Sequence, residues 1–272
     1  IYFNILLHRK KERFIVSLLA MLTIKNTLKI VCFGLFFQFG NAQYITVDEN
    51  QTAQQLVENV LINNPCANIS NVSVSGGNFA SGAKSFGYFD GSGTTFPFEK
   101  GIILSTGRIS DAPGPNTYIS DGGAGMGWEG DPDLDQALGL SSTFNATILE
   151  FDFVPLGNKI SFDYIFSSEQ YLLNPSANQC NYTDGFAFLL KEAGSSTYQN
   201  LAVIPGTTTP VKVNTVRGSG TICPPANAAY FDAFNEDEHP TNFNGQTVVL
   251  TAQSDVIPGT LYHIKLVIAD EG

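Results

Sequence analysis

The fold of this chain is decided by one stretch, ILEFDFVPLGNKISFDYIFSS, residues 148–168. From Leu149 to Phe153 every second residue is apolar, which is typical of a β-strand buried on one face. Residues 160–166 repeat the pattern. The linker between them, Pro155 to Asn158, is short and rich in turn-forming residues. The stretch therefore predicts two strands joined by a hairpin-sized turn.

Short patterns of the same kind recur along the chain, separated by Gly, Pro and Asn. A single helix is predicted from Thr52 to Asn64, where apolar residues recur at helical spacing before Pro65. With one helix, a βαβ fold is excluded. We expect an all-β, two-sheet antiparallel β-sandwich of jelly-roll type with one N-terminal helix. The remaining strands are predicted at residues 69–74, 86–89, 102–105, 185–190, 201–204, 211–216, 247–251 and 261–268.

Charge is distributed unevenly over the 272 residues, whose net charge is −11. Residues 1–42 carry +5, which leaves −16 for residues 43–272. Nucleic-acid binding needs a basic face that neutralises phosphates, so nucleic acid is excluded as a partner. Hydrophobic residues make up 43% of the chain, which is enough for one large domain with a core and argues against disorder.

The basic leader has the organisation of a signal peptide, predicted over residues 21–42. Lys25 and Lys29 form its basic region, and about ten apolar residues follow, well short of the ~20 that span a membrane. Small residues before the junction predict cleavage between Ala42 and Gln43. We expect no transmembrane segment in the mature chain.

Both ends of the sequence carry further expectations. Residues 1–20 precede the predicted start at Met21 and are interpreted as an upstream reading frame or the edge of a fragment. The mature domain is expected over residues 43–272. Because the sequence stops at Gly272 directly after a strong strand pattern, we expect this domain to be truncated at its C-terminus, with an anchoring segment beyond.

Three cysteines remain in the mature chain, Cys66, Cys180 and Cys223. An exported protein meets oxidising conditions, but spacing alone does not determine which cysteines pair. We favour a Cys180–Cys223 disulfide, with Cys66 free or paired beyond Gly272. The alternative is three reduced, buried thiols. No C-x-x-C spacing supports a zinc site.

Acidic residues provide the candidate metal ligands. Asp131, Asp133 and Asp135 have D-x-D-x-D spacing, and carboxylate oxygens suit Ca²⁺. The loop is not an EF-hand, since Gln136 and Ser142 replace the Gly and Glu of that motif. The alternatives are a solvated acidic loop or the N-terminus of a helix, which favours carboxylates.

Three further acids lie at strand ends: Glu169, Asp184 and Asp270. They either converge at one end of the sandwich to ligate a metal or cap exposed backbone donors. The run from Glu236 to His239 is interpreted as a solvated loop.

Motifs for nucleophilic catalysis are absent from the sequence. It contains neither G-x-S-x-G nor H-E-x-x-H, so no hydrolase of these types is indicated. Paired carboxylates would serve a glycosidase, but chance pairs are expected among so many acids. Trp128, Tyr118 and Tyr171 are the candidate platforms for sugar binding.

Several segments, read together, resemble the choice-of-anchor L domain of exported bacterial proteins. The resemblance covers roughly residues 45–272 and is carried by Phe89 to Gly93, Gly101 to Gly107, Leu149 to Phe153, Phe162 to Tyr171, Asp184 to Phe188 and Tyr262 to Asp270. It implies a protein that is secreted or attached to the outer cell surface, with variable regions and a sorting or anchoring segment after the domain.

These observations lead to one expected function and two rivals. We expect a non-catalytic binding or adhesion module, calcium-stabilised through the acids named above, whose partners are glycans or surface proteins. The rivals are a secreted carbohydrate-active hydrolase that uses paired carboxylates and a structural spacer.

Overall fold

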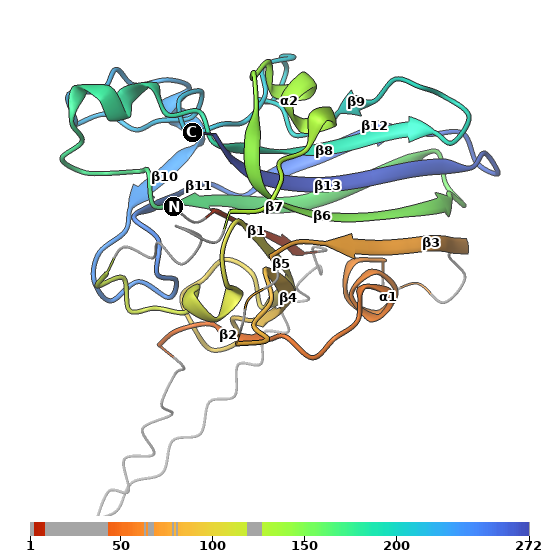
Figure 1. Ribbon diagram of the computed structural model, residues 1–272, viewed down its shortest axis with the longest axis horizontal. Helices are drawn as coiled ribbons and strands as arrows, with labels where there is room; N and C mark the ends of the chain where they lie inside the picture. The colour runs from red at the N-terminus through yellow and green to blue at the C-terminus, as the bar shows by residue number, and fades with distance from the viewer. Residues whose placement is uncertain are drawn as a thin grey trace, which may run out of the picture.

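The computed structural model describes residues 3–8, 43–62, 64, 68–77, 79, 81–118 and 127–271. Within these residues the chain forms two antiparallel sheets and a few short helices (Figure 1). The all-β, antiparallel class predicted from the alternating patterns is confirmed, and the jelly-roll type stays a prediction. Ala42 and Cys66 lie outside the described residues.

The larger sheet has the strand order β10–β11–β7–β1–β5–β4–β2, and β12 also pairs with β7. The smaller sheet has the order β3–β6–β13–β8–β9. The strands of the larger sheet are β1 Phe3–His8, β2 Thr46–Asp48, β4 Phe86–Asp90, β5 Lys100–Ser105, β7 Lys159–Ser168, β10 Phe231–Phe234, β11 Gly245–Thr247 and β12 Leu250–Asp255. Those of the smaller sheet are β3 Asn68–Ser75, β6 Thr143–Val154, β8 Gly185–Glu192, β9 Gln199–Asn200 and β13 Tyr262–Glu271.

The main core lies between the two sheets. It contains the apolar faces of β6 and β7 together with those of β8 and β13. Aromatic rings meet across it: Tyr164 of β7 lies 4.8 Å from Phe186 of β8, and Phe162 lies 4.8 Å from Phe188, measured between ring centroids. Such tilted and edge-to-face contacts add to the free energy gained by burying the rings.

The predicted hairpin between the two deciding strands is wrong. β6 belongs to the smaller sheet and β7 to the larger one, so Pro155 to Asn158 carries the chain from one sheet to the other. The physical reason is that both strands are strongly apolar on one face. In opposite sheets both faces lie in the main core, where the β7 face packs on β8 through Tyr164 and Phe186.

The predicted helix differs from the observed one in its geometry. Thr52 caps a short α-helix, α1 (Ala53–Gln55), through a capping box with Gln55, and the chain continues as a π-helix, η1 (Leu56–Ile62). In a π-helix residues five apart are neighbours, which brings Leu56 and Leu61 to the same face. Both are buried against the main core.

Each sheet is also covered on its outer face. The second α-helix, α2 (Pro132–Leu138), packs Leu134 and Leu138 on β8 and β13, in a cluster with Ala187 and Leu189. It lies over the smaller sheet in Figure 1. Loops cover the larger sheet with a second apolar cluster that includes Ile103 and Ile165. Strand β8 is therefore buried on both faces, as its continuous apolar run predicts.

Three predicted strands differ from the structure. Residues 201–204 and 211–216 are buried but form only isolated bridges, because the chain turns back at Gly206, which has a φ of +77°. The predicted strand 247–251 is divided between β11 and β12. The short 3₁₀ segments are η2 Ile109–Asp111, η3 Ala177–Asn181 and η4 Ala228–Tyr230.

Strand β1 comes from the segment interpreted as an upstream reading frame. It lies between β5 and β7 and is antiparallel to both, so that Leu6 is paired with Ile103 on one side and Ile165 on the other. Among the helices of the described part of the chain, none is long and apolar enough to cross a membrane.

Candidate binding site

The connection between β10 and β11 forms the most distinctive surface loop. Its sequence, from Asn235 to Asn244, is rich in residues whose short side chains hydrogen-bond to nearby backbone. The backbone N–H of Asn235 donates to the Asn244 carbonyl at 2.9 Å and closes the loop. The Asn235 side chain donates to the Phe243 carbonyl at 2.7 Å. The loop is therefore closed by hydrogen bonds between its own residues.

Distant segments hold the loop in place. The Pro240 carbonyl accepts hydrogen bonds from the backbone of Ile45 and of Gly114, both at 3.0 Å, and the Asp237 carbonyl accepts one from Asn116. Burial lowers the pKa of His239. Its Nδ1 accepts a hydrogen bond from the backbone N–H of Thr241 at 3.1 Å. A surface that is ordered in advance costs less entropy when it binds a partner.

Two hollows flank this loop. Their volumes are about 360 and 660 Å³, and they share Phe234, Asn235, Glu236 and Glu238. We call the two hollows together the acidic groove. The smaller hollow is also lined by Thr95, Asp232, Ala233, His239 and Pro240, and the larger by Tyr171, Leu173, Asp237 and Asn244.

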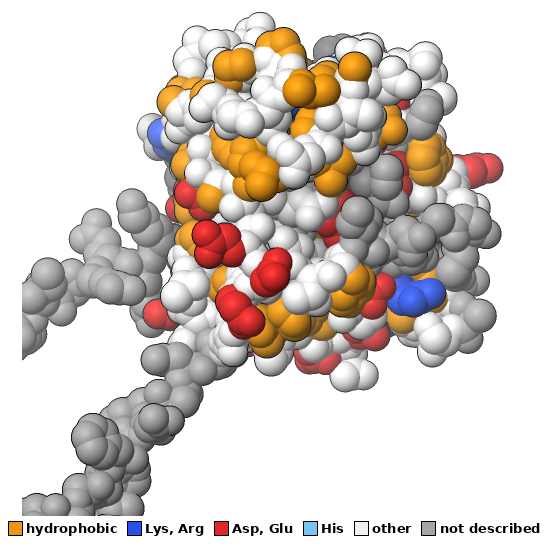
Figure 2. Space-filling model, turned by 90° about the vertical axis from the view of Figure 1, so that its left-hand side faces the viewer, with side chains coloured by type: hydrophobic (Ala, Val, Ile, Leu, Met, Phe, Trp, Pro, Cys, Tyr) orange, Lys and Arg blue, Asp and Glu red, His pale blue; other side chains and the backbone are white. Residues whose placement is uncertain are grey.

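The groove carries one sign of charge. Asp232, Glu236, Asp237 and Glu238 are exposed acids, and none of the described residues that line the groove is a lysine or arginine. Figure 2 shows acidic side chains gathered among apolar ones on the side of the molecule where β10 and β11 lie. Carboxylates clustered in a hollow attract cations and raise their association rate.

The predicted mature N-terminus borders this groove. Tyr44 donates its hydroxyl hydrogen to Glu238 Oε2 at 2.9 Å, and the Gln43 side chain donates to the same oxygen. Both contacts orient the Glu238 carboxylate beside the hollow.

Of the three aromatic candidates for sugar binding, one ring is exposed. Tyr118 is 54% exposed. Tyr171 lines the larger hollow but is buried, with its ring centroid 5.0 Å from that of Phe231. Trp128 donates its indole N–H to the Ala146 carbonyl at 2.7 Å and packs edge-on against Phe79. Tyr171 therefore packs in the core and Trp128 holds a loop, and neither offers a flat, exposed ring for a sugar.

The D-x-D-x-D acids lie at the start of α2. Asp131 is its N-cap, with Oδ1 accepting from the backbone N–H of Leu134 at 2.9 Å. The ammonium of Lys265 on β13 lies 2.7 Å from Asp131 Oδ2 and 2.6 Å from Asp133 Oδ2. A protein cation therefore already lies between two of the predicted ligands. Asp135 stands further along the helix and does not join this contact.

Asp184 and Asp270 are neighbours at the end of the smaller sheet. The pairing of Gly185 with Ala269 brings them together, and both are buried. Asp270 Oδ2 accepts a hydrogen bond from the Asn145 side chain at 3.0 Å, and Asp184 accepts one from the backbone N–H of Glu271. Their other oxygens, Asp184 Oδ2 and Asp270 Oδ1, have no hydrogen-bond partner within the described part of the chain.

Burial dominates the ionisation of this pair. It raises the pKa of Asp270 to about 7. It also raises the pKa of Asp184 well above its usual range, and the neighbouring Asp270 charge adds to that effect. Burying both carboxyls as anions is costly, and a proton on one of them or a bound cation would lower that cost.

Glu169 follows β7 in the larger sheet, and its carbonyl accepts from the Asn244 side chain at 2.6 Å. It thus supports the loop of the acidic groove. Among the described residues no three His, Cys, Asp or Glu side chains are grouped closely enough to hold a metal ion.

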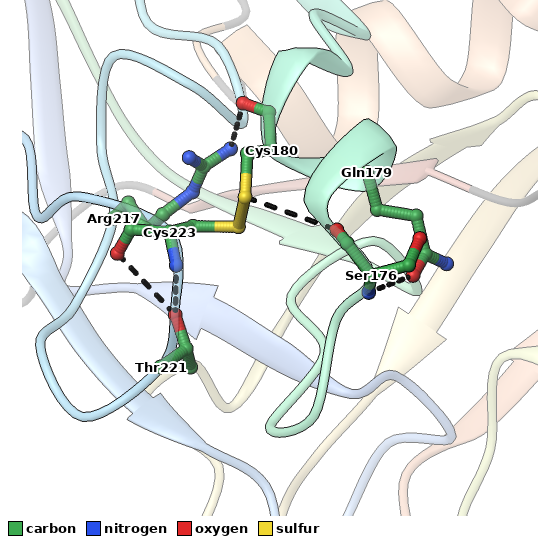
Figure 3. Close-up of a disulfide and its surroundings, with 6 residues drawn as sticks. All are labelled: Ser176, Gln179, Cys180, Arg217, Thr221 and Cys223. Atoms are coloured by element: carbon green, nitrogen blue, oxygen red, sulfur yellow. Dashed lines mark hydrogen bonds between the residues drawn. A yellow bond between two sulfur atoms is a disulfide. The ribbon is translucent and has the colours of Figure 1, made fainter.

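A disulfide links Cys180 of η3 to Cys223, the pair favoured from the sequence (Figure 3). Arg217 donates to the Cys180 carbonyl at 3.0 Å beside it. The bond and this contact fasten two loops that are 43 residues apart in the chain. Oxidised cysteines fit an exported protein.

A family model for the choice-of-anchor L domain matches residues 45–272. The chain belongs to the choice-of-anchor L domain family. No curated protein and no solved structure matches it. Membership in this family indicates a surface-associated, extracellular module and a role that is generally non-enzymatic.

Sequence reasoning missed the acidic groove of this choice-of-anchor L domain. The run from Glu236 to His239 was expected to be a solvated loop, and its acids are indeed exposed. The overlooked signal was the asparagines on both sides of the run, at positions 235, 242 and 244. The side chains of these asparagines donate hydrogen bonds to backbone carbonyls and so hold the loop in place.

Proposed function

We propose that this domain is a secreted or cell-surface binding module that recognises its partner through the acidic groove and performs no catalysis. The observation that carries the proposal is the combination of four exposed carboxylates with a loop held by hydrogen bonds to distant segments. Rigid, complementary charge gives specificity and a fast association rate.

The chemistry of the groove favours a basic segment of a surface protein over a glycan. Carboxylates attract lysine and arginine side chains directly. Sugar-binding sites rely on exposed aromatic rings, and Tyr171 is the only tyrosine or tryptophan among the described residues that line the groove, where it is buried. The exposed Leu173 and the half-buried Phe234 supply apolar contact beside the charges.

The test compares two variants of equal charge. The groove variant carries Glu236→Gln, Asp237→Asn and Glu238→Gln. Its control carries Glu99→Gln, Glu192→Gln and Asp255→Asn, all exposed and none of them among the residues that line the groove. The probe is a fluorescent Lys/Arg-rich peptide, followed by anisotropy at two salt concentrations.

We expect the groove variant to bind the peptide at least tenfold more weakly, because it lacks three of the four carboxylates. Such a change corresponds to a loss of about 1.4 kcal/mol of binding free energy. The control should bind within about twofold of the parent chain. Equal loss in both variants would mean that only overall charge matters. Binding of a glycan array but not of the peptide would favour the sugar ligand.

The hydrolase alternative has less support. A glycosidase needs one carboxyl kept protonated by its surroundings beside the bound substrate. The carboxyls whose pKa is raised by burial, Asp184 and Asp270, do not line either hollow.

Calcium stabilisation is a separate part of the proposal, supported by the two buried oxygens of Asp184 and Asp270 that have no described partner. Ca²⁺ takes six to eight oxygen ligands, so backbone and water would complete the set. Thermal melts of the chain in EDTA and then in millimolar Ca²⁺ test it. A bound ion raises the melting temperature by mass action. An unchanged melting temperature, or an equal rise in Asp270→Asn, would contradict calcium binding here.

A further inference from the structure

Strand β1 lies in the larger sheet but comes from a part of the chain outside the matched domain. The family match begins at residue 45, yet residues 3–8 lie in the middle of the sheet that the matched domain builds. β1 is antiparallel to both β5 and β7, so these two strands are parallel to each other and do not pair directly. We call the space between β5 and β7 the strand slot.

The slot is bounded by apolar side chains on both faces. Toward the main core it is bordered by Ile102 and Leu104 of β5 and by Tyr164 and Phe166 of β7, all buried. On the opposite face, Ile103 and Ile165 belong to the second apolar cluster. An occupant of the slot is therefore sandwiched between two cores, which selects an extended, uncharged segment.

An empty slot is costly for the sheet. Two strands separated by one missing neighbour lie about 9.5 Å apart, twice the usual spacing. Their facing N–H and C=O groups would lose their partners, and unpaired strand edges recruit other strands. Direct pairing of β5 with β7 would require one of them to slide across the aromatic contacts of Tyr164 and Phe162 with β8.

We propose that the slot is a strand-acceptor site, which in the exported protein binds an extended apolar segment of a partner polypeptide. Cleavage after Ala42, predicted from the leader, would separate residues 3–8 from the domain and leave the slot for that segment. Peptides that add a strand to a sheet gain main-chain hydrogen bonds on each available edge. This slot offers two edges, one over six residues from Asp163 to Ser168 on β7 and one over four residues from Ile102 to Ser105 on β5.

The proposal goes beyond the acidic groove and is tested separately on the full chain. A specific protease site is inserted between Asn26 and Thr27, and the chain is purified with its disulfide formed. Cleavage then makes residues 3–8 exchangeable. The probe is a labelled synthetic peptide of sequence FNILLH with polar tails, and its control carries Leu6→Pro, which removes the N–H of the central residue.

We expect native mass spectrometry to show one labelled peptide per cleaved chain, and the control peptide to bind at least tenfold more weakly. Within residues 102–105 and 163–168, the amides that face the slot should lose hydrogen-exchange protection when the peptide is removed and regain it when the peptide returns. Ser105 and Phe166, whose N–H groups donate to Ser85 and Thr247, serve as internal controls. The melting temperature should fall by roughly 10 °C without peptide.

Three results would overturn the proposal. One is a cleaved chain that releases residues 3–8 and keeps both its melting temperature and its amide protection. Another is a dimer of the cleaved chain that excludes the peptide, which assigns the slot to a second copy. The third is aggregation that excess peptide does not prevent. Groove variants do not touch the slot, so failure here leaves the test of the acidic groove unaffected.

Discussion

The ammonium of Lys265 lies 2.7 Å from Oδ2 of Asp131, and this contact ties the outer face of the smaller sheet to the first turn of α2. The side chains are only 10% and 5% exposed. Burial alone would lower the pKa of Lys265, but its hydrogen bonds to Asp131 and Asp133 outweigh that effect and raise it. The pair is thus a charged contact that depends on both partners.

Replacing Lys265 by Met should destabilise the domain strongly. It leaves the Asp131 carboxylate buried without its cation, which costs about 3–5 kcal/mol of unfolding free energy. Adding Asp131→Asn, which keeps a good N-cap residue, should recover much of the loss. Urea unfolding measures both. Lys159→Met, at an exposed position, is the control and should change stability by less than about 0.5 kcal/mol. A loss in Lys265→Met no larger than in the control would contradict the importance of the pair.

The buried pair Asp184 and Asp270 should make stability depend on pH. Their folded pKa values are raised, that of Asp270 to about 7, so the folded state keeps protons that the unfolded state releases from pH ~4 upward. The free energy of unfolding should therefore fall as pH rises from ~4 to the folded pKa, by at most about 1.4 kcal/mol per pH unit for each carboxyl.

Urea unfolding in EDTA at pH 5, 6, 7 and 8 measures this slope. Asp270→Asn should reduce the slope, because only Asp184 of the pair still titrates, whereas Asp255→Asn at an exposed position should leave it unchanged. A slope that is the same in all three chains would show that the pair does not titrate as its burial requires.

The pKa values of His239 and His263, the two histidines of the described mature chain, should lie on opposite sides of the ordinary histidine value. The hydrogen bond to Glu150, with the contact to Asp152 at 2.7 Å, raises the pKa of His263, although burial opposes it. Burial lowers the pKa of His239. NMR titration of the imidazole signals should give one value above and one below 6.5. Glu150→Gln should lower the pKa of His263 and leave that of His239 unchanged. Equal shifts of both would contradict this assignment.

The stability contributed by the raised pKa of His263 has a definite sign. It is fully present below the unfolded pKa of about 6.5 and is lost as pH rises through the folded pKa. In a chain carrying both Asp184→Asn and Asp270→Asn, the remaining decrease of stability above pH 6.5 should therefore disappear when His263→Gln is added. A decrease that persists in this triple variant would mean that another group titrates in this range.

Removing the disulfide should also destabilise the domain. Cys180 and Cys223 close a loop of 43 residues, for which the chain-entropy estimate is about 4 kcal/mol. The variant with Cys180→Ala and Cys223→Ala should show this loss in urea unfolding. Dithiothreitol should produce a similar loss in the parent chain and none in the variant. If reduction leaves the free energy of unfolding of the parent chain unchanged, the disulfide does not stabilise the domain.

The alternation of apolar residues predicts most strands because it reports which side of an extended segment is buried. Strands β7, β8 and β13 were predicted within three residues of their bounds, whereas β6 begins at Thr143, well before the predicted start at Ile148. The same reasoning failed at Pro155 to Asn158, since a short linker can join paired strands or strands in opposite sheets equally well. It also failed at residues 201–204, where buried apolar residues form a turn-back instead of a ladder.

The candidate site was harder to predict than the strands, because it is formed by contacts between residues far apart in the sequence. Asp131 and Asp133 have the spacing of metal ligands, but the cation between them comes from Lys265, more than 130 residues later. The acidic run beside His239 is visible in the sequence, whereas the hydrogen bonds from Ile45, Gly114 and Asn116 that hold its loop are not.

By itself, the sequence determined the all-β class, the apolar faces that form the core and the acidic character of the domain, because each is a property of neighbouring residues. Tertiary structure alone decided which strands share a sheet, which cation meets Asp131, and where residues 3–8 lie. The physical reason is that the free energy of burial depends on local pattern, while pairing and charge complementarity are settled between segments far apart in the chain.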